Sequence, residues 1–177
     1  MKCKKNSKFG KLHLFIKSYT MKPGTFTQMY FQLVFAVKNR EAALPKSVRN
    51  QIFDYIGGIN TNLKHKSIIV NGMSDHVHIL LGLNPSFSIS DTVYNIKRGS
   101  SLFINSEKLC MGHFTWQEGY GAFTYSRSQL DDIYKYIENQ EGHHSNETFR
   151  KEYTSLLEKS KIDYNPLFLF DFFDDNK

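Results

Sequence analysis

The fold is decided by Ser67-Ile-Ile-Val-Asn-Gly-Met-Ser-Asp-His-Val-His-Ile-Leu-Leu-Gly-Leu83. Two apolar runs stand on either side of the short polar stretch Ser74-Asp75, a pattern typical of a β-hairpin. Side chains alternate between the two faces of a strand, so His76 and His78 point to one face and Val77 to the other. The hairpin therefore places a pair of imidazoles on one face of a sheet whose other face is apolar.

The spacing of these two histidines suits a metal ion. Imidazoles at positions i and i+2 of a strand can bind one divalent cation without bending the backbone. A His-hydrophobe-His triplet also arises by chance on half-exposed strands, and the triplet alone does not separate the two interpretations. A metal site requires further ligands elsewhere in the chain.

The composition is that of a globular protein with one sizeable core. The 177 residues are 40% hydrophobic and 15% aromatic, and a chain of this length fits one domain. No apolar run reaches the roughly 18 residues of a membrane span, and we find no signal peptide after the basic N-terminus. The two cysteines, Cys3 and Cys110, form neither a metal-binding spacing nor a disulfide framework, which favours a cytoplasmic, reducing environment.

The net charge of +6 comes from the N-terminus. Residues 1–20 contain six lysines and no acidic residue, whereas the other 157 residues contain 17 basic and 17 acidic residues. We interpret residues 1–20 as a basic extension, either a tail that contacts nucleic acid or sequence upstream of a true start at Met21. Residues 21–177 are interpreted as a single domain. The overall charge is therefore no indication that this domain binds DNA.

Hydrophobic periodicity predicts the remaining elements. In chain order we expect a strand at 25–37, a helix at 45–63, the hairpin strands at 67–73 and 76–83, a helix from 88 or 90 to 105, short strands at 114–118 and 121–125, and helices at 129–140 and 147–159. The order β-α-β-β-α-β predicts an α+β fold. It is typical of a ferredoxin-like (RRM-like) antiparallel sheet with helices on one face, here followed by C-terminal helices.

The expected helix at 129–140 carries a second group of reactive residues. Ile133 and Ile137 belong to its buried stripe, and Tyr136 and Gln140 lie one turn apart on the flank of that stripe. Taken alone, a helical tyrosine is usually a packing residue with a solvated hydroxyl. Its occurrence after a histidine pair is what makes the helix a candidate site.

The two motifs follow one another as His76-Val-His78 and Tyr136-x-x-x-Gln140. This ordered set resembles the single-tyrosine transposases of the HUH superfamily, which serve small insertion sequences with hairpin ends and include the REP-associated tyrosine transposases. Two further segments resemble the family's first strand and the stretch before its catalytic helix, namely residues 23–37 and 116–126. The resemblance covers about residues 21–173.

The resemblance implies a metal-dependent transposase that cleaves and rejoins single-stranded DNA. In that family two histidines and a glutamine bind one divalent cation and a tyrosine attacks a DNA phosphate. This implies His76, His78 and Gln140 as ligands of Mg²⁺ or Mn²⁺, and Tyr136 as the nucleophile that forms a covalent 5′-phosphotyrosine. Because the three ligands are neutral, we expect Mn²⁺ to bind more readily than Mg²⁺, which would need help from DNA phosphates.

The resemblance also implies a homodimer and a single-stranded DNA substrate with a hairpin. The apolar strand at 25–37 is expected to offer a partner an exposed edge, unless the apolar tail at 167–173 covers the same surface. We expect DNA contacts from four basic residues and one aromatic residue: Lys64, Lys66, Lys97, Arg98 and Tyr94. Ordinary surface charges would show the same pattern.

Two other functions stay open. One is a module that binds hairpin DNA or RNA without cleaving it, and the other is a metal-dependent phosphoesterase that activates water. Neither requires Tyr136 as a nucleophile.

Overall fold

The computed structural model describes residues 24, 26–38, 43–145 and 147–173. Four antiparallel strands form one sheet in the spatial order β2-β3-β1-β4. They are β1 (Tyr30–Ala36), β2 (Lys66–Gly72), β3 (His76–Gly82) and β4 (Gly121–Tyr125). The prediction of a basic extension at residues 1–20 lies outside the described residues.

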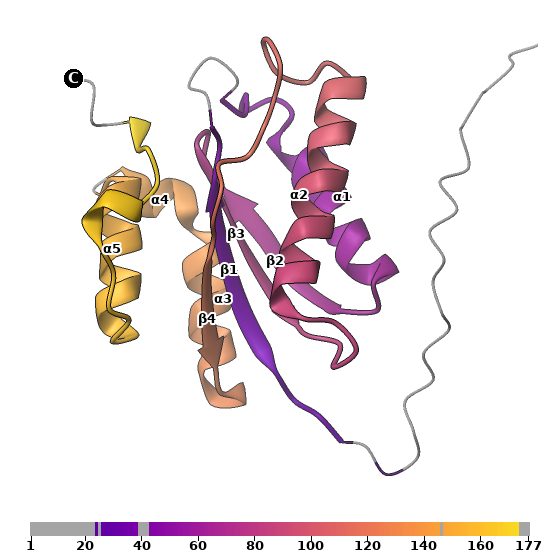
Figure 1. The fold of residues 1–177 in the computed structure, drawn as a ribbon, viewed down its shortest axis with the longest axis vertical. Coiled ribbons are helices and arrows are strands. Elements are labelled where there is room, and N and C mark those ends of the chain that lie inside the picture. Colours follow the sequence, from indigo (N-terminus) through magenta and orange to yellow (C-terminus); the bar gives the residue numbers. More distant parts are fainter. Residues whose placement is uncertain (1–23, 25, 39–42, 146, 174–177) are drawn as a thin grey trace, which may run out of the picture.

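Two helices cover one face of this sheet. α1 (Arg49–Asn62) and α2 (Ile89–Ser106) lie side by side against it (Figure 1). The Ser88 side chain caps α2 by accepting a hydrogen bond from Asp91 N. It thereby satisfies one of the backbone N–H groups that have no helical partner at the start of a helix. The predicted ferredoxin-like α+β fold is confirmed.

β1 is an interior strand rather than an edge. It pairs with β3 on one side and with β4 on the other, so the edges of the sheet are β2 and β4. Its last five residues, from Gln32 to Ala36, are all buried, as is typical of a strand covered on both faces. The expectation that the 25–37 strand offers an exposed edge to a partner is therefore wrong.

The alternation along β3 separates two hydrophobic clusters. Val77 and Ile79 are completely buried in the main core, which includes residues of α1 and α2. Leu80 points to the opposite face and packs with Leu130 and Ile137 of the helix α3 (Leu130–Glu138). The histidines of β3 share the face of Leu80, so they lie under α3 and not under the main core.

The helix predicted over 129–140 is interrupted. A 3₁₀ turn at Arg127–Gln129 leads into α3, and Asn139 then leaves helical geometry with φ −93° and ψ 32°. A short helix, α4 (Gln140–His144), follows directly. The break puts Gln140 at the first position of α4, where its side chain is completely buried.

The predicted strand at 114–118 is wrong. Within the described chain this segment contributes an isolated bridge between Trp116 and Val37. Gln117 N donates to Ala36 O at 2.8 Å, so the segment does run beside the end of β1. Gly119 has a φ of +73°, a left-handed turn that glycine adopts readily, and this turn separates the segment from β4.

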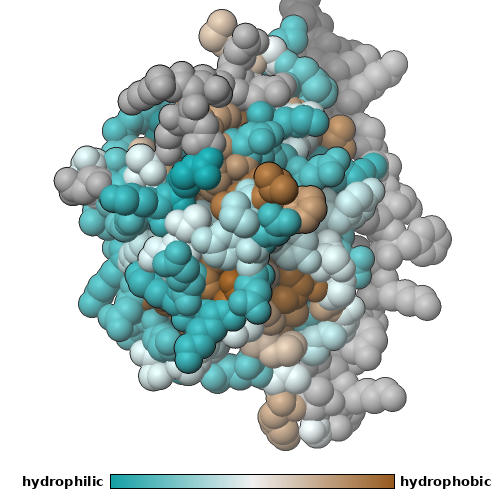
Figure 2. Space-filling view, turned by 60° about the vertical axis from the view of Figure 1, so that its left-hand side comes forward, coloured by the Kyte–Doolittle hydropathy of each residue, from teal (hydrophilic) through white to brown (hydrophobic). Residues whose placement is uncertain are grey.

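The C-terminal elements cover the other face of the sheet. α3, α4 and α5 (Phe149–Lys159) lie opposite α1 and α2 (Figure 1). The apolar tail folds back on α5, with the Phe170 ring 4.8 Å from that of Tyr153 and the Phe172 ring 5.2 Å from that of Phe149. The surface on this side is mainly hydrophilic, with small apolar patches between polar side chains (Figure 2). None of the described helices is long and apolar enough to cross a membrane.

Candidate metal and nucleophile site

The two histidines of β3 are completely buried and are each held through Nδ1. Asp75 Oδ1 lies 2.8 Å from His76 Nδ1, and Gln32 Nε2 lies 2.8 Å from His78 Nδ1. The Gln32 amide is fixed in turn by the hydroxyl of Tyr125, which donates to Gln32 Oε1 at 2.8 Å. A carboxylate only accepts hydrogen bonds, so His76 Nδ1 carries a proton and the ring turns its Nε2 towards Gln140 and Glu152.

Asp75 remains a carboxylate in this arrangement. Burial alone would raise its pKa, but the hydrogen bond and the charge of His76 lower it below the usual value. The hairpin turn therefore positions an acid that orients the first histidine. A carboxylate behind a metal-binding imidazole is a common arrangement in metal sites, because it fixes both the tautomer and the ring.

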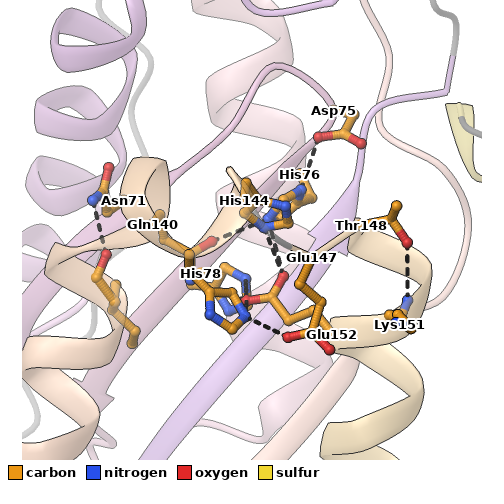
Figure 3. Close-up of polar contacts among 12 residues, drawn as sticks. Asn71, Asp75, His76, His78, Gln140, His144, Glu147, Thr148, Lys151 and Glu152 are labelled. Atoms are coloured by element: carbon orange, nitrogen blue, oxygen red, sulfur yellow. Dashed lines mark hydrogen bonds and ion pairs between the residues drawn. The ribbon is translucent and has the colours of Figure 1, made fainter.

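The break between α3 and α4 brings the second motif to the histidines. Gln140 Oε1 lies 3.2 Å from His76 Nε2, and the half-buried Tyr136 ring packs edge-on against the His78 ring at 5.9 Å. Figure 3 shows Gln140 beside both histidines. The four residues predicted from the two motifs thus form one cluster.

Glu152 of α5 enters the same cluster. Its carboxylate, with a side chain only 1% exposed, lies 3.4 Å from His76 Nε2 through Oε2 and 3.3 Å from His78 Nε2 through Oε1. It accepts hydrogen bonds from the hydroxyl of Tyr136 and from Gln140 Nε2, the latter at 3.0 Å. Figure 3 shows the carboxylate pointing into the space below the histidines.

Sequence reasoning missed Glu152, although a signal exists. The buried residues of α5 are Phe149, Glu152, Tyr153 and Leu157, which is the spacing of one helix face. An acidic residue within an otherwise apolar stripe is unusual, because burying a lone carboxylate is costly unless it is paired. The stripe predicts a buried acid but not its partner.

The electrostatics of the cluster follow from burial and from Glu152. Burial would raise the pKa of Glu152, but His78, His144 and His76 together lower it well below its usual range. Burial lowers the pKa of His78. Burial and then the charge of Glu152 raise the pKa of Tyr136, which holds the phenol protonated. The cluster therefore contains an ionised acid and a neutral tyrosine.

A divalent cation fits this donor set. His78 Nε2 is buried and makes no hydrogen bond among the described residues. Ligand atoms of His76, His78 and Glu152 lie within 4.8 Å of one another, and Gln140 Oε1 faces the same space. Imidazole nitrogens with carboxylate or amide oxygens are ligands that Mn²⁺ and related cations accept. The site can hold one such ion.

The comparisons with known proteins agree with this geometry. Residues 25–140 match the sequence model of the family described as "Transposase IS200 like". The match spans His76, His78, Tyr136 and Gln140. The chain belongs to the IS200-like transposase family. Glu152 lies beyond the matched residues.

Individual relatives support the assignment of this chain to the transposase family. The ISDra2 transposase TnpA of Deinococcus radiodurans is 32% identical over 123 residues, which cover 66% of this chain and 87% of that protein. The crystal structure of a candidate transposase from D. radiodurans R1 is 27% identical, with a TM-score of 0.52, and covers 69% of this chain and 98% of its own. A REP-associated tyrosine transposase bound to a REP hairpin shares the fold at 12% identity and a TM-score of 0.52, covering 71% of this chain and 74% of that one.

The residues predicted to contact DNA are not gathered at this site. Tyr94, Lys97 and Arg98 belong to α2, on the far side of the sheet from the histidines. The Lys97 ammonium donates to the carbonyls of Gln117, at 2.8 Å, and Gly119, and burial lowers its pKa to about 8. DNA contact by these three residues stays a prediction, and Lys97 has a structural role as well.

Lys66 is the first residue of β2, and Lys64 lies in the turn before it. Both are exposed, and both line a hollow of about 490 Å³ together with Tyr30 and residues 82–85. The hollow is open, so a phosphate could approach both ammonium groups. Their contact with DNA also stays a prediction.

Asn71 of β2 holds the end of α3, and we expect Asn71→Ala to lower the free energy of unfolding by about 1 to 3 kcal/mol. Asn71 Nδ2 donates to Ile137 O at 2.8 Å and to Glu138 O at 3.0 Å, two carbonyls that the end of α3 leaves without helical partners. Chemical denaturation measures the change. Asn95→Ala, which removes a contact within α2, is the control; equal small losses for both variants would contradict the role of Asn71.

Proposed function

We propose that this transposase cleaves and rejoins single-stranded DNA at hairpin-bearing element ends through a covalent 5′-phosphotyrosine at Tyr136. The observation that carries the proposal is the single buried cluster formed by His76, His78, Gln140 and the hydroxyl of Tyr136. A phosphoesterase that activates water needs the histidines, but it has no use for a tyrosine hydroxyl beside them.

His76, His78 and Gln140 would hold one divalent cation, Mg²⁺ or Mn²⁺. When bound, this ion polarises the scissile phosphate and offsets the negative charge that develops at phosphorus. Asp75 and Gln32 contact the two rings through Nδ1, and both Nε2 atoms lie beside the carboxylate of Glu152.

Tyr136 supplies the nucleophile. Its oxygen forms a bond to phosphorus as the bond to the 3′ oxygen breaks, and the 3′ oxygen leaves as a hydroxyl by taking a proton from water. The phenol is a poor nucleophile while protonated, and its nearest proton acceptor among the described residues is the ionised Glu152. The phosphotyrosine keeps the energy of the phosphodiester bond, so a DNA 3′ hydroxyl can reverse the step without ATP.

A cavity beside Tyr136 supports access for DNA. Its volume is about 750 Å³, and it is lined by β4, α3 and α5, with Tyr136 and Glu152 among the lining residues. Space of this size next to a tyrosine hydroxyl suits an extruded nucleotide better than a stacked duplex.

The test is cleavage of a single-stranded oligonucleotide that contains an inverted repeat from the DNA flanking the gene. The strand carries a label at its 3′ end and is incubated with full-length protein and Mn²⁺. We expect a labelled protein–DNA adduct on a denaturing gel and a free 3′ hydroxyl on the other fragment. Cleavage without an adduct would favour a phosphoesterase, and binding without cleavage would favour a binding module.

Hairpin recognition leads to a second expectation. Affinity for a hairpin-bearing single strand should exceed that for a blunt duplex of equal length, and it should fall as salt rises because basic side chains such as Lys64 and Lys66 release counterions from phosphates. Fluorescence anisotropy at several salt concentrations measures both effects. Equal binding of the two DNAs at physiological salt would refute hairpin recognition and leave the chemistry untouched.

We also propose that the transposase is a homodimer. Since β1 is interior, a pairing of sheets would have to use one of the edge strands, β2 or β4. Light scattering at micromolar concentration should give twice the mass of the chain. A monomer at that concentration would exclude an active site assembled from two subunits.

A further inference from the structure

We propose that Glu152 is a ligand of the divalent cation, so that α5 makes the site anionic and able to bind metal before DNA arrives. The inference rests on the proposed function for the identity of the site. It adds a residue that lies outside the family match at 25–140. It also replaces the neutral donor set of two imidazoles and one amide with a set that carries a negative charge.

The first argument is the arrangement of acceptors around His76. Its Nδ1 donates to Asp75, so a neutral ring leaves the Nε2 lone pair facing Gln140 Oε1 at 3.2 Å and Glu152 Oε2 at 3.4 Å. Two oxygens of different side chains thus converge on one ring nitrogen, which is the arrangement that ligands of a shared cation adopt. A divalent ion at this point would be held by all three of these atoms while His76 Nδ1 keeps its hydrogen bond to Asp75.

The second argument is the spacing of these atoms. Neighbouring ligands of an octahedral Mg²⁺ or Mn²⁺ ion are separated by about 3 Å, given metal–oxygen distances of about 2.1 Å. The contacts of Glu152 with His76 Nε2 and His78 Nε2, at 3.4 and 3.3 Å, are close to that separation. Small side-chain shifts would therefore complete the coordination.

The third argument is the buried and unpartnered nitrogen of His78. The side chain is 0% exposed, and Nε2 makes no hydrogen bond among the described residues although it lies 3.3 Å from Glu152 Oε1. With the Gln32 amide turned so that its oxygen accepts from His78 Nδ1, Nε2 is free of its proton and lies beside the Glu152 carboxylate, where both can bind one cation. Glu152 Oε2 also accepts from His144 at 3.0 Å, which holds the carboxylate in place from behind.

The charge of Glu152 has a consequence for metal choice. Mg²⁺ prefers anionic oxygen ligands and gives up its water reluctantly. With Glu152 in the set, the bound ion keeps one net positive charge with which to attract a DNA phosphate. Mn²⁺ and Mg²⁺ should therefore bind to the protein alone.

The experiment is calorimetric titration of the full chain with MnCl₂ in the absence of DNA. We expect Glu152→Gln, which keeps the size of the side chain and its acceptor oxygen, to raise the dissociation constant of Mn²⁺ about 10- to 100-fold. The matched control is Glu147→Gln. Glu147 lies 3.0 Å from His143 and lines the same cavity, but it makes no contact with His76 or His78 in the described structure, so its loss should leave the dissociation constant near that of wild type.

Two further measurements make the outcome decisive. Glu152→Asp keeps the carboxylate and should bind Mn²⁺ more tightly than Glu152→Gln, and circular dichroism shows whether each variant is folded. Unchanged or tighter Mn²⁺ binding by a folded Glu152→Gln protein would overturn the proposal. Because no DNA is present, a wild-type protein that fails to cleave hairpin DNA would refute the proposed function without affecting this result.

Discussion

Tyr136→Phe is expected to reduce cleavage of hairpin-bearing single-stranded DNA by at least about 1,000-fold, because no other group replaces a covalent nucleophile. The same variant should still bind the DNA and Mn²⁺, since the phenol ring stays beside His78 and only the hydroxyl is lost. Gel assays of the labelled adduct and anisotropy of the same oligonucleotide measure the two properties separately.

Tyr134→Phe is the matched control for this experiment. Tyr134 lies on the same helix, α3, but its side chain is 37% exposed, so removal of its hydroxyl should leave cleavage unchanged. If Tyr136→Phe cleaves at the wild-type rate, the tyrosine mechanism is wrong and a hydrolase that activates water becomes the better interpretation.

The sequence predicted the parts of the site that depend on local periodicity. His76 and His78 share a face because strand side chains alternate, and the structure confirms the hairpin at 66–82. Tyr136 and Gln140 are one helical turn apart in sequence. Their orientation survives the break at Asn139, since α4 continues directly from α3. The histidine pair needed only the geometry of one strand, whereas Tyr136 and Gln140 belong to two consecutive helices.

The rest of the site depends on tertiary contacts that no local pattern reveals. Glu152 reaches the histidines because α5 folds across the α3 face of the sheet, and Gln32 reaches His78 because β1 and β3 are neighbours in the sheet. Asp75 was placed in the hairpin turn, where it does lie. Its hydrogen bond to His76 depends on the shape of that turn.

Two errors in the predicted elements have the same origin. Residues 114–118 have the composition of a strand, but Asn105 and Lys97 of α2 bind their backbone, through Phe114 on one side and Gln117 on the other. The long strand at 25–37 was expected to leave an edge exposed, whereas the chain returns as β4 and covers it. Both segments do have the composition of strands. Which backbone groups they pair with is decided by residues far away in the sequence.

Replacement of both histidines, His76→Ala with His78→Ala, is expected to weaken Mn²⁺ binding by at least about 100-fold and to abolish cleavage. This loss should exceed that of Glu152→Gln, because two ligands are removed together and alanine keeps no donor atom, whereas glutamine keeps an oxygen. Calorimetry with MnCl₂ measures the affinity, with His113→Ala, an exposed histidine, as the control.

Both His76 and His78 are completely buried, so the double variant carries cavities. His78→Gln, which keeps most of the side-chain volume, gives a second measurement if the double variant unfolds. If metal titration of the folded variants matches wild type, the cation binds elsewhere and His76 and His78 are not its ligands. No residue on the far face of β3 can take the place of two imidazoles that point into the same space.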